Sequence, residues 1–276
     1  MTASLQNETT TLRDGVRIPR LGFGTFQMDG DEVERAVGWA LELGYRLIDT
    51  ASAYGNEREV GRAIRGSEVP REEVFLTSKV WNSDQGYDSA LRAFDASLER
   101  LGTEYLDLYL IHWPVEGRFV ETWRALERLL GEERVRAIGV SNFLIPHLRE
   151  LLDAAETVPA VNQIEHHPRL RQPELLGFCR EHGIQPEAWS PLMKGDVTEL
   201  GEAVEIGERH GMTAAQTVLR WELQHDVIPI PKSSHRQRIA ENADVFDFEL
   251  TAGEMATLDG LDRGERIGPD PADFDF

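Results

Sequence analysis

The chain has 276 residues, of which 41% are hydrophobic, and its 49 acidic and 29 basic residues give a net charge of −20. This charge repels nucleic acid and acidic membranes, which bind proteins through Lys and Arg, and the single cysteine, Cys179, excludes an internal disulfide and any multi-cysteine metal site. Without an apolar run of about 18 residues or an N-terminal signal segment, we expect a soluble cytoplasmic protein with no nucleic-acid or membrane partner.

The basic residues are unusual in kind, because only three of them are lysines, Lys79, Lys194 and Lys232. Many acids with few lysines are typical of proteins from salt-loving microbes, in which high ionic strength screens the repulsion within an acidic surface. A GC-rich genome, which writes Arg in place of Lys, explains the scarcity of lysine but not the excess of acids. We therefore hypothesise a halophilic protein whose fold needs molar salt.

The chain opens with two short extended runs around Asp14-Gly15, which predict a β-hairpin. A short apolar strand followed by a helix then repeats eight times. The strands are expected at residues 22–26, 46–49, 74–79, 106–112, 135–140, 160–164, 184–189 and 227–230. The helices are expected at residues 31–43, 57–64, 87–101, 120–130, 146–155, 173–182, 199–210 with 213–224, and 235–243. A further helix at 252–261 precedes an acidic tail.

Short, continuous apolar strands are typical of a parallel sheet that is buried on both faces. Eight strand–helix units in 276 residues predict an α/β fold, a single (β/α)8 TIM barrel domain over residues 1–276, with an N-terminal β-hairpin and a C-terminal extra helix and tail. An open doubly wound sheet is the alternative, but its GxGxxG motif is absent after the first strand. In the tail, Phe274 and Phe276 are expected to fold over a pocket.

Every expected strand ends in polar or aromatic groups, and in barrels of this type such side chains face the active site. They are Thr25 with Phe26, Asp49 with Tyr54, Lys79, His112, Ser141 with Asn142, Gln163, Trp189 with Ser190, and Lys232 with Ser233. Each alone has an ordinary explanation, such as a surface lysine, a core histidine or a helix cap. Their recurrence at all eight strand ends predicts a functional site there.

Three of these side chains suggest acid–base chemistry. Lys79 ends the apolar run VFLTSK, where burial is costly unless a partner such as Asp49 is near. A buried Lys79–Asp49 pair beside Tyr54 would stabilise phenolate and lower the pKa of Tyr54 from about 10 towards neutrality. Tyr54 is therefore predicted to be a general acid, and His112 is predicted to orient a substrate oxygen.

Other kinds of chemistry find little support in the sequence. His166 and His167 are adjacent, so their side chains diverge in an extended chain, and no third ligand lies at a zinc spacing. We therefore expect no metal site. The chain has no GxSxG motif, and Cys179 has no evident base beside it, so a nucleophile for acyl transfer is missing.

Seven segments, in their order and spacing, resemble the aldo-keto reductase family. They are GYRLIDTASAYGNEREVGRAI, FLTSKVW, SLERLGTEYLDLYLIHWP, RAIGVSNF, VNQIEHHP, AWSPL and IPKSSHRQRIAEN. The compact loop between Trp113 and Phe119 and the short tail resemble the microbial members related to 2,5-diketo-gluconate reductases. The resemblance covers essentially the whole chain.

The resemblance implies that Asp49, Tyr54, Lys79 and His112 form the family's catalytic tetrad, in which Tyr54 donates a proton to a carbonyl oxygen while NADPH delivers hydride to the carbon. It also implies cofactor-binding residues, which are Thr25, Asp49, Ser141, Asn142, Gln163, Trp189, Ser190, Leu192, Lys232, Ser233, Arg238, Glu241 and Asn242. The implied substrate pocket is lined by Phe26, Trp81, His112 and Trp113. For Phe26, filling of the core is the simpler explanation.

Within this set, the cations Lys232 and Arg238 at a helix start suit the 2'-phosphate of NADPH, although ordinary surface pairing with Glu241 or Asp244 is an alternative. We expect NADPH as the cofactor, with NADH as a weaker alternative. The implied protein is a monomer that reduces a small-molecule aldehyde or ketone. The alternatives are a regulatory subunit that binds nicotinamide nucleotide, and a sugar-phosphate isomerase or aldolase on the same fold.

Overall fold

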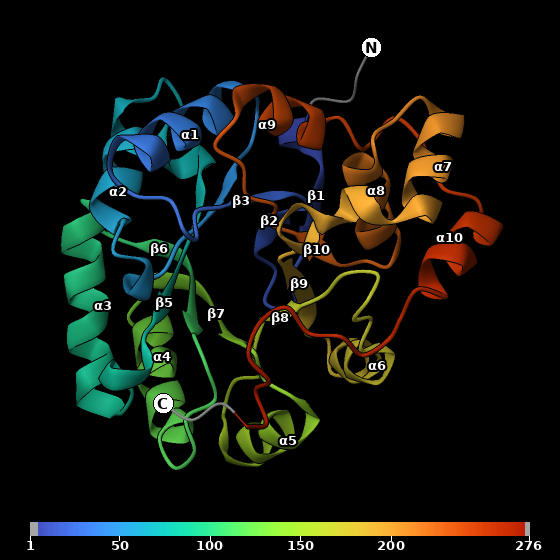
Figure 1. The fold of residues 1–276 in the computed structure, drawn as a ribbon. Coiled ribbons are helices and arrows are strands. Elements are labelled where there is room, and N and C mark those ends of the chain that lie inside the picture. Colours follow the sequence, from blue (N-terminus) through green and yellow to red (C-terminus); the bar gives the residue numbers. More distant parts are fainter. Residues whose placement is uncertain (1–4, 274–276) are drawn as a thin grey trace.

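A computed structural model describes residues 5–273, and in it eight parallel strands form a barrel surrounded by helices (Figure 1). The strands are β3 (Gly22–Gly24), β4 (Leu47–Asp49), β5 (Phe75–Val80), β6 (Leu106–Ile111), β7 (Val135–Ser141), β8 (Val161–Glu165), β9 (Gln185–Trp189) and β10 (Ile228–Pro229). Each pairs in parallel with the next along the chain. The predicted (β/α)8 fold is confirmed, and each strand lies within two residues of its expected bounds.

The barrel closes between its first and last strands, where the chain packs tightly. The amide of Gly24 donates a hydrogen bond of 3.1 Å to the carbonyl of Pro231, just after β10. At Gly22 a Cβ atom would lie 2.6 Å from Cγ2 of Ile230, so only glycine fits between β3 and this segment. The two glycines in GFG therefore allow β3 to pack closely against the last strand. They are not part of a phosphate-binding loop, in agreement with the absence of a GxGxxG motif.

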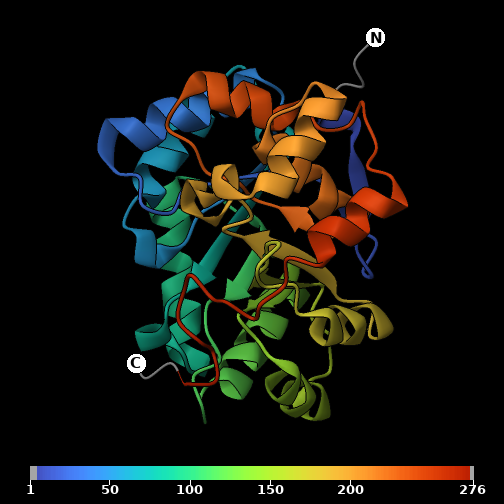
Figure 2. The same ribbon diagram turned by 45° about the vertical axis from the view of Figure 1, so that its right-hand side comes forward.

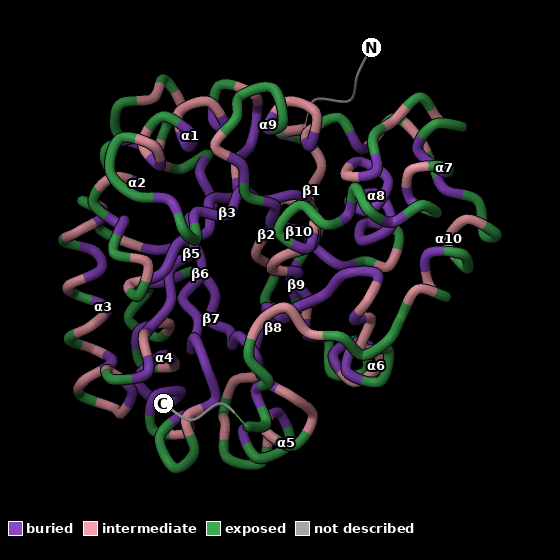
Figure 3. The backbone as a smooth tube through the Cα atoms, in the orientation of Figure 1, coloured by how far each residue is buried: buried purple, intermediate pink, exposed green. Residues whose placement is uncertain are grey.

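The helices follow the strands in alternation, and Figure 3 shows buried strands inside a ring of helices whose outer faces are exposed. They are α1 (Gly30–Glu42), α2 (Glu57–Gly66), α3 (Tyr87–Leu101), α4 (Phe119–Gly131), α5 (Ile145–Ala154), α6 (Pro173–Glu181), α7 (Gly201–His210), α8 (Ala214–Gln224), α9 (Arg236–Ala243) and α10 (Ala252–Asp259). Their ends follow local chemistry: Gly102 ends α3 at a φ of 64°, and Thr213 begins α8 with a capping box. None of the helices within residues 5–273 is long and apolar enough to cross a membrane.

The predicted N-terminal hairpin is present and plugs the barrel. It consists of β1 (Thr9–Thr11) and β2 (Arg17–Pro19), and Gly15 in its turn has a φ of 85°. Leu12 and Ile18 pack into one cluster with interior side chains such as Leu47 at the start of β4. Because these contacts lie at the start of the strands, the hairpin covers the amino-terminal end and leaves the carboxyl ends open to ligands.

The segment after α10, the red ribbon of Figures 1 and 2, returns across the barrel and crosses the front of β8. Its main chain is held by the carbonyl of Arg169, which accepts hydrogen bonds from the amides of Arg263 and Glu265. The expectation that Phe274 and Phe276 fold over a pocket concerns residues outside the described part of the chain. The described tail therefore ties the chain end to the loop after β8.

Candidate active site

Asp49, Tyr54 and Lys79 meet inside the carboxyl end of the barrel. Nζ of Lys79 lies 2.7 and 2.9 Å from the two carboxylate oxygens of Asp49 and donates to the carbonyl of Thr50 at 3.0 Å. It also lies 3.2 Å from the hydroxyl oxygen of Tyr54. Asp49 and Lys79 are both buried, so their opposite charges compensate each other where water cannot. The predicted Lys79–Asp49 pair is present, with Tyr54 attached to it.

The expected direction of the Tyr54 pKa was wrong. Burial of the hydroxyl raises the pKa of Tyr54 above its ordinary value of 10.0, and the neighbouring Asp49 carboxylate raises it too, although Lys79 lowers it. The attraction of Lys79 favours phenolate, but the loss of solvation on burial penalises it more strongly. Tyr54 consequently keeps its proton at neutral pH, which is the state that a proton donor needs.

Lys79 itself stays charged in this setting. Burial alone would lower the pKa of Lys79, but the charges of Asp49 and Tyr54 and their hydrogen bonds raise it above 10.5 overall. The ammonium group therefore remains beside the phenol across the physiological range. A permanent positive charge there would stabilise any phenolate that forms when Tyr54 gives up its proton.

His112 completes the cluster as a neutral imidazole. It follows β6, and its ring lies 5.6 Å from that of Tyr54 between centroids, at an interplanar angle of 74°. Burial and the charge of Lys79 lower the pKa of His112 well below 6.5. Nδ1 is buried without a hydrogen-bond partner in the described part of the chain. The ring is thus able to offer one N–H to an incoming polar atom.

The loop that carries Tyr54 is held by Asn56, whose role the sequence reasoning missed. Tyr54 ends the 3-10 helix η2 (Ser52–Tyr54), and Asn56 follows two residues later as a buried side chain. Its amide donates to the carbonyls of Thr25 and Met28 at 2.9 and 2.8 Å, and it accepts from the hydroxyl of Thr50 at 2.8 Å. With these hydrogen bonds made, Asn56 fixes the loop against the end of β3. The only signal in the sequence was the Asn in Gly55-Asn56-Glu57, and its burial is visible only in the structure.

Aromatic rings surround the tetrad. Phe26 is 52% exposed and lies 5.0 Å from the ring of Tyr54, so its interpretation as core filling was wrong. Trp81 lies edge-on to His112 at 5.1 Å. Trp113 is buried next to His112 in sequence, and its carbonyl accepts a 2.7 Å hydrogen bond from Gln85. Phe26 lies two residues beyond Gly24, where β3 ends, so it belongs to the loop after the strand.

A second set of polar side chains lies beside the tetrad, on or directly after β7, β8 and β9. The amide of Asn142 donates to the carbonyl of His112 at 3.0 Å, and its oxygen accepts from the indole N–H of Trp189 at 2.8 Å. The hydroxyl of Ser141 donates to the carbonyl of Gln163 at 2.9 Å, and the amide of Gln163 donates to Asp49 at 2.8 Å. These hydrogen bonds join the tetrad and four of the expected cofactor residues in one network.

Further expected cofactor residues frame this network. Thr25 is buried, and its hydroxyl donates to the carbonyl of Asp49 at 2.9 Å. Ser190 adopts a φ of 51°, and its carbonyl accepts from the amide of Met193 at 2.9 Å, which turns the chain sharply after β9. Leu192 is half-buried against the core beneath this turn. Thr25 and the turn therefore flank the network at the ends of β3 and β9.

The expected phosphate and adenine residues lie after β10 and on α9. Lys232 and Arg238 are exposed, and within residues 5–273 neither makes an ion pair, so the alternative of surface pairing with Glu241 or Asp244 finds no support. The hydroxyl of Ser233 accepts from the amide of His235 at 3.1 Å, just before α9. Glu241 accepts from Gln237 instead, at 2.8 Å, and the remaining expected residue, Asn242, is buried in α9.

These features fit a phosphorylated dinucleotide. Lys232 and Arg238, two exposed cations without an ion-pair partner in the described part of the chain, suit phosphate oxygens in an otherwise acidic protein. Oε1 of Gln163 receives no hydrogen bond from any described residue, which leaves it open to an amide N–H of a ligand. Half-buried Trp189, whose indole N–H donates to Asn142, adds an aromatic ring to the same network. The donor and acceptor set is therefore compatible with NADPH.

Two buried acids near the site were not singled out from the sequence. Glu187 on β9 accepts a 2.6 Å hydrogen bond from the amide of Gln163. Glu165 at the end of β8 accepts from the amide of Ile267 in the tail at 2.5 Å. Both lie on apolar strands at positions whose side chains point into the barrel, which was the available signal.

The rest of the chain adds no competing centre. His166 and His167 diverge as expected, onto Glu222 at 2.6 Å and Glu165 at 3.1 Å. Among residues 5–273 no group of three His, Cys, Asp or Glu side chains could hold a metal ion. Cys179 is buried, and burial raises the pKa of its thiol to about 11. It is the inert helix-face thiol that was expected.

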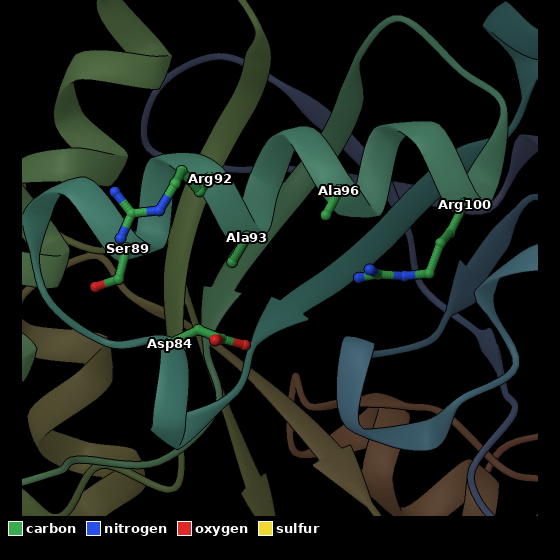
Figure 4. A pocket seen from close by; sticks show the side chains of 6 residues that line it. All are labelled: Asp84, Ser89, Arg92, Ala93, Ala96 and Arg100. Carbon is green, nitrogen blue, oxygen red and sulfur yellow. The ribbon is translucent and has the colours of Figure 1, made fainter.

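Two hollows lie on the outside of the barrel. One, of about 290 Å³, is lined by Asp84 and by α3 residues that include Arg92 and Arg100 (Figure 4). The other is a groove of about 1080 Å³ that includes residues of α1 and α2, such as Arg35 and Arg62. Both are lined largely by charged and small side chains and contain no tetrad residue, so the candidate site remains the carboxyl end of the barrel.

Comparison with known proteins agrees with this geometry. A profile of the Aldo/keto reductase family matches residues 20–263. The chain is 52% identical over 270 residues to a glyoxal reductase of Bacillus subtilis, covering 98% of each protein. It is similar to the solved structure of a Gox0644 mutant in complex with NADPH, with 45% identity and a TM-score of 0.93 over 97% of this chain and 98% of that one.

A second solved structure, of a protein provisionally described as a 2,5-diketo-D-gluconic acid reductase B, is 40% identical with a TM-score of 0.92 over 97% of this chain and 96% of that one. Both the family and the likeness to this microbial group are as the sequence motifs predicted. The chain belongs to the aldo/keto reductase family of oxidoreductases.

Proposed function

We propose that the protein reduces an aldehyde or ketone to the alcohol with NADPH, with Asp49, Tyr54, Lys79 and His112 as its catalytic residues. The observation that carries the proposal is the contact of the Lys79 ammonium with both the Asp49 carboxylate and the Tyr54 hydroxyl. This arrangement holds a protonated phenol against a fixed positive charge. It is suited to giving one proton to an oxygen atom.

Each residue of the site has a separate role in this reaction. NADPH, when bound, supplies the hydride that the carbonyl carbon accepts. Tyr54 donates its proton to the carbonyl oxygen, and Lys79 stabilises the phenolate that remains. Asp49 keeps Lys79 charged and fixed, while neutral His112 offers an N–H to the same oxygen and orients it. In the reverse direction the same phenolate would accept the proton of an alcohol.

The cofactor assignments follow the two groups of residues described above. Ser141, Asn142 and Gln163 would bind the carboxamide and Trp189 would stack on the nicotinamide ring. Thr25, Ser190 and Leu192 flank this end of the site. Lys232, Ser233 and Arg238 would bind the 2'-phosphate, with Glu241 and Asn242 near the adenine. The NADPH complex of the similar Gox0644 mutant supports this proposal, and NADH is the weaker alternative because it lacks that phosphate.

The substrate is proposed to be a small carbonyl compound bound among Phe26, Trp81, His112 and Trp113. These aromatic walls offer apolar contact, and the hydroxyl of Tyr54 and the ring of His112 offer polar contact. The name of the similar glyoxal reductase supports including small dicarbonyls among the candidates. We further propose that residues 1–276 act as one domain, in a cytoplasmic monomer.

The test is the loss of reduced-nicotinamide absorbance with NADPH and a panel of glyoxal, aromatic and sugar-derived aldehydes in molar KCl. Wild type should turn over at least one of them, and Tyr54→Phe should lose about 10²–10⁴-fold in kcat while binding NADPH with wild-type affinity. Wild type that binds NADPH tightly without turnover would instead favour the regulatory-subunit alternative. Turnover that survives in Tyr54→Phe would refute Tyr54 as the acid.

A further inference from the structure

Glu187 is a buried acid inside the barrel that the proposed mechanism does not use. It lies in the middle of β9, in register with Gln163 of β8, and is fully buried. Its side chain points to the same side of the strand as that of Trp189 two residues later. Burying a carboxyl group in an apolar strand costs free energy that a hydrophobic residue would not. The hydrogen bond that Glu187 accepts from Gln163 must therefore have a use that offsets this cost.

Glu187 and Asp49 share one amide group. Nε2 of Gln163 lies 2.8 Å from Oδ2 of Asp49 and 2.6 Å from Oε2 of Glu187. Asp49 is paired with the Lys79 ammonium, so its carboxylate can only accept hydrogen bonds. The shared atom must then be the amide nitrogen, whose two N–H groups are used by the two acids. Oε1 of Gln163 is left without a donor among the described residues.

We infer that Glu187 is a positioning residue for the cofactor, which together with Asp49 locks the amide of Gln163 so that its oxygen faces the nicotinamide carboxamide. Asp49 alone excludes the flipped amide but holds only one of its N–H groups. Glu187 holds the second, and two bonds fix the plane of the amide where one leaves it free to rotate. The inference rests on the proposed function, because it presupposes that Gln163 meets the carboxamide.

The charges around Glu187 are consistent with this role. Burial and the nearby Asp49 carboxylate raise the pKa of Glu187 to about 8, although Gln163 and Lys79 lower it in part. At neutral pH Glu187 is thus mostly a neutral acid, which accepts from Gln163 without adding a second negative charge beside Asp49. Its other oxygen, Oε1, has no partner in the described part of the chain. Gln163 is consequently the only described residue that hydrogen-bonds to Glu187.

The experiment compares two ligands that differ in one hydrogen-bond donor. NADP⁺ has a carboxamide N–H, whereas its 3-acetylpyridine analogue has a methyl group in that place and keeps the carbonyl. Dissociation constants for both are measured by titration calorimetry with wild type, Glu187→Leu and Glu187→Gln. Adenosine 2',5'-bisphosphate, which lacks the nicotinamide, reports whether each variant keeps its adenosine-binding half.

Wild type should bind the analogue about five- to tenfold more weakly than NADP⁺, as expected for one lost hydrogen bond. Glu187→Leu should reduce this ratio to less than about twofold, because the freed Gln163 amide rotates and no longer holds its oxygen in place to accept from the carboxamide N–H. Glu187→Gln keeps an acceptor oxygen of the same reach and should retain the wild-type ratio. Affinity for the bisphosphate should be the same in all three proteins.

Several results would overturn the inference. One is a Glu187→Leu variant that prefers NADP⁺ over the analogue as strongly as wild type does. Another is a Glu187→Gln variant that loses this preference, and that result would refute the inference even if the leucine variant fails to fold. A parallel loss of affinity for the bisphosphate would show a general structural role instead. If wild type did not bind NADP⁺ at all, the proposed function would be refuted, and this inference with it. The wild-type titration with NADP⁺ separates that outcome from the others.

Discussion

Both carboxylate oxygens of Asp49 lie within 2.9 Å of Nζ of Lys79, and both residues are buried. A buried pair of this kind contributes little net stability compared with a well-packed hydrophobic pair, because each charge loses its hydration. Its contact with the Tyr54 hydroxyl gives it a chemical use instead. Stability and activity should therefore respond differently when the pair is dismantled.

We predict that Lys79→Met and Asp49→Asn each lower the free energy of unfolding by about 3–5 kcal/mol, since each leaves one buried charge uncompensated. The double variant should recover most of this loss, because neither charge remains, yet it should not recover carbonyl reduction. Urea unfolding and NADPH consumption measure the two properties. Recovery of activity in the double variant would show that the charge of Lys79 is not needed beside Tyr54.

Arg238→Ala should lower the preference for NADPH over NADH by about tenfold, the worth of one charge-assisted hydrogen bond. Arg236→Ala is the matched control, because it removes the same charge from the same helix, and Arg236 is paired with Glu42 at 3.1 Å. The measurement is the ratio of dissociation constants for the two nucleotides. Equal loss of preference in both variants would mean that the net charge of the helix, not Arg238, makes the distinction.

Much of the site was predictable because parallel strands end at one edge of a barrel. Once eight strands were located, Asp49, Lys79 and His112 had to lie together. The sequence also indicated that Lys79 needed a partner. It could not show the balance between charge and solvation, so the direction of the Tyr54 pKa was wrong. That balance depends on the depth of the hydroxyl, which is a property of the packed structure.

Contacts between distant segments were also beyond the sequence. The place of Phe26 depended on whether β3 extended as far as residue 26, which a short apolar run does not decide. The use of Glu187 depended on the register of β8 with β9, which places it opposite Gln163. Similarly, nothing in the tail indicated that Gly268 would lie against Trp189. These relations follow from three-dimensional packing rather than from local patterns.

Gly268→Ala should disturb the contact between the tail and Trp189, because a Cβ atom there would overlap the edge of the indole ring. We expect the free energy of unfolding to fall by about 1–3 kcal/mol, as for other overpacked sites, and the affinity for NADPH to fall with it. Gly260→Ala is the control, since its Cβ would lie at 3.4 and 3.5 Å from the carbonyl oxygens of Thr257 and Ala256, which is ordinary contact. Equal effects of both substitutions on stability and affinity would contradict this account.

The melting temperature should rise between dilute buffer and molar KCl. The net charge of −20 repels itself, and the screening length falls from about 30 Å at 0.01 M salt to about 3 Å at 1 M. Salt also weakens exposed ion pairs such as Arg124–Glu121 and Arg128–Glu132, but each contributes only about 0–1 kcal/mol. Sucrose at matched osmolality is the control. A melting temperature that does not change with KCl would refute the halophilic hypothesis.

Glu187 should make stability fall as pH rises. The folded-state pKa of about 8 lies above the ordinary value of 4.5, so the folded protein holds this proton more tightly than the unfolded chain does. The resulting stabilisation is complete below pH 4.5 and is lost as pH rises towards 8. The Glu187→Gln variant cannot lose a proton there, so its free energy of unfolding relative to wild type should increase across this window and level off above it.

Urea unfolding at intervals from pH 4.5 to 9 measures this difference, and Glu205→Gln serves as the control, since Glu205 is exposed on α7 and makes no ion pair within residues 5–273. The neighbouring Asp49, Lys79 and Tyr54 are the same in both proteins of the Glu187 comparison, so the two proteins differ only in the side chain at residue 187. A flat difference between wild type and Glu187→Gln would mean that Glu187 is ionised in the folded barrel. Glu187 and Asp49 would then both be negatively charged, with only the amide of Gln163 and the ammonium of Lys79 to stabilise the two charges.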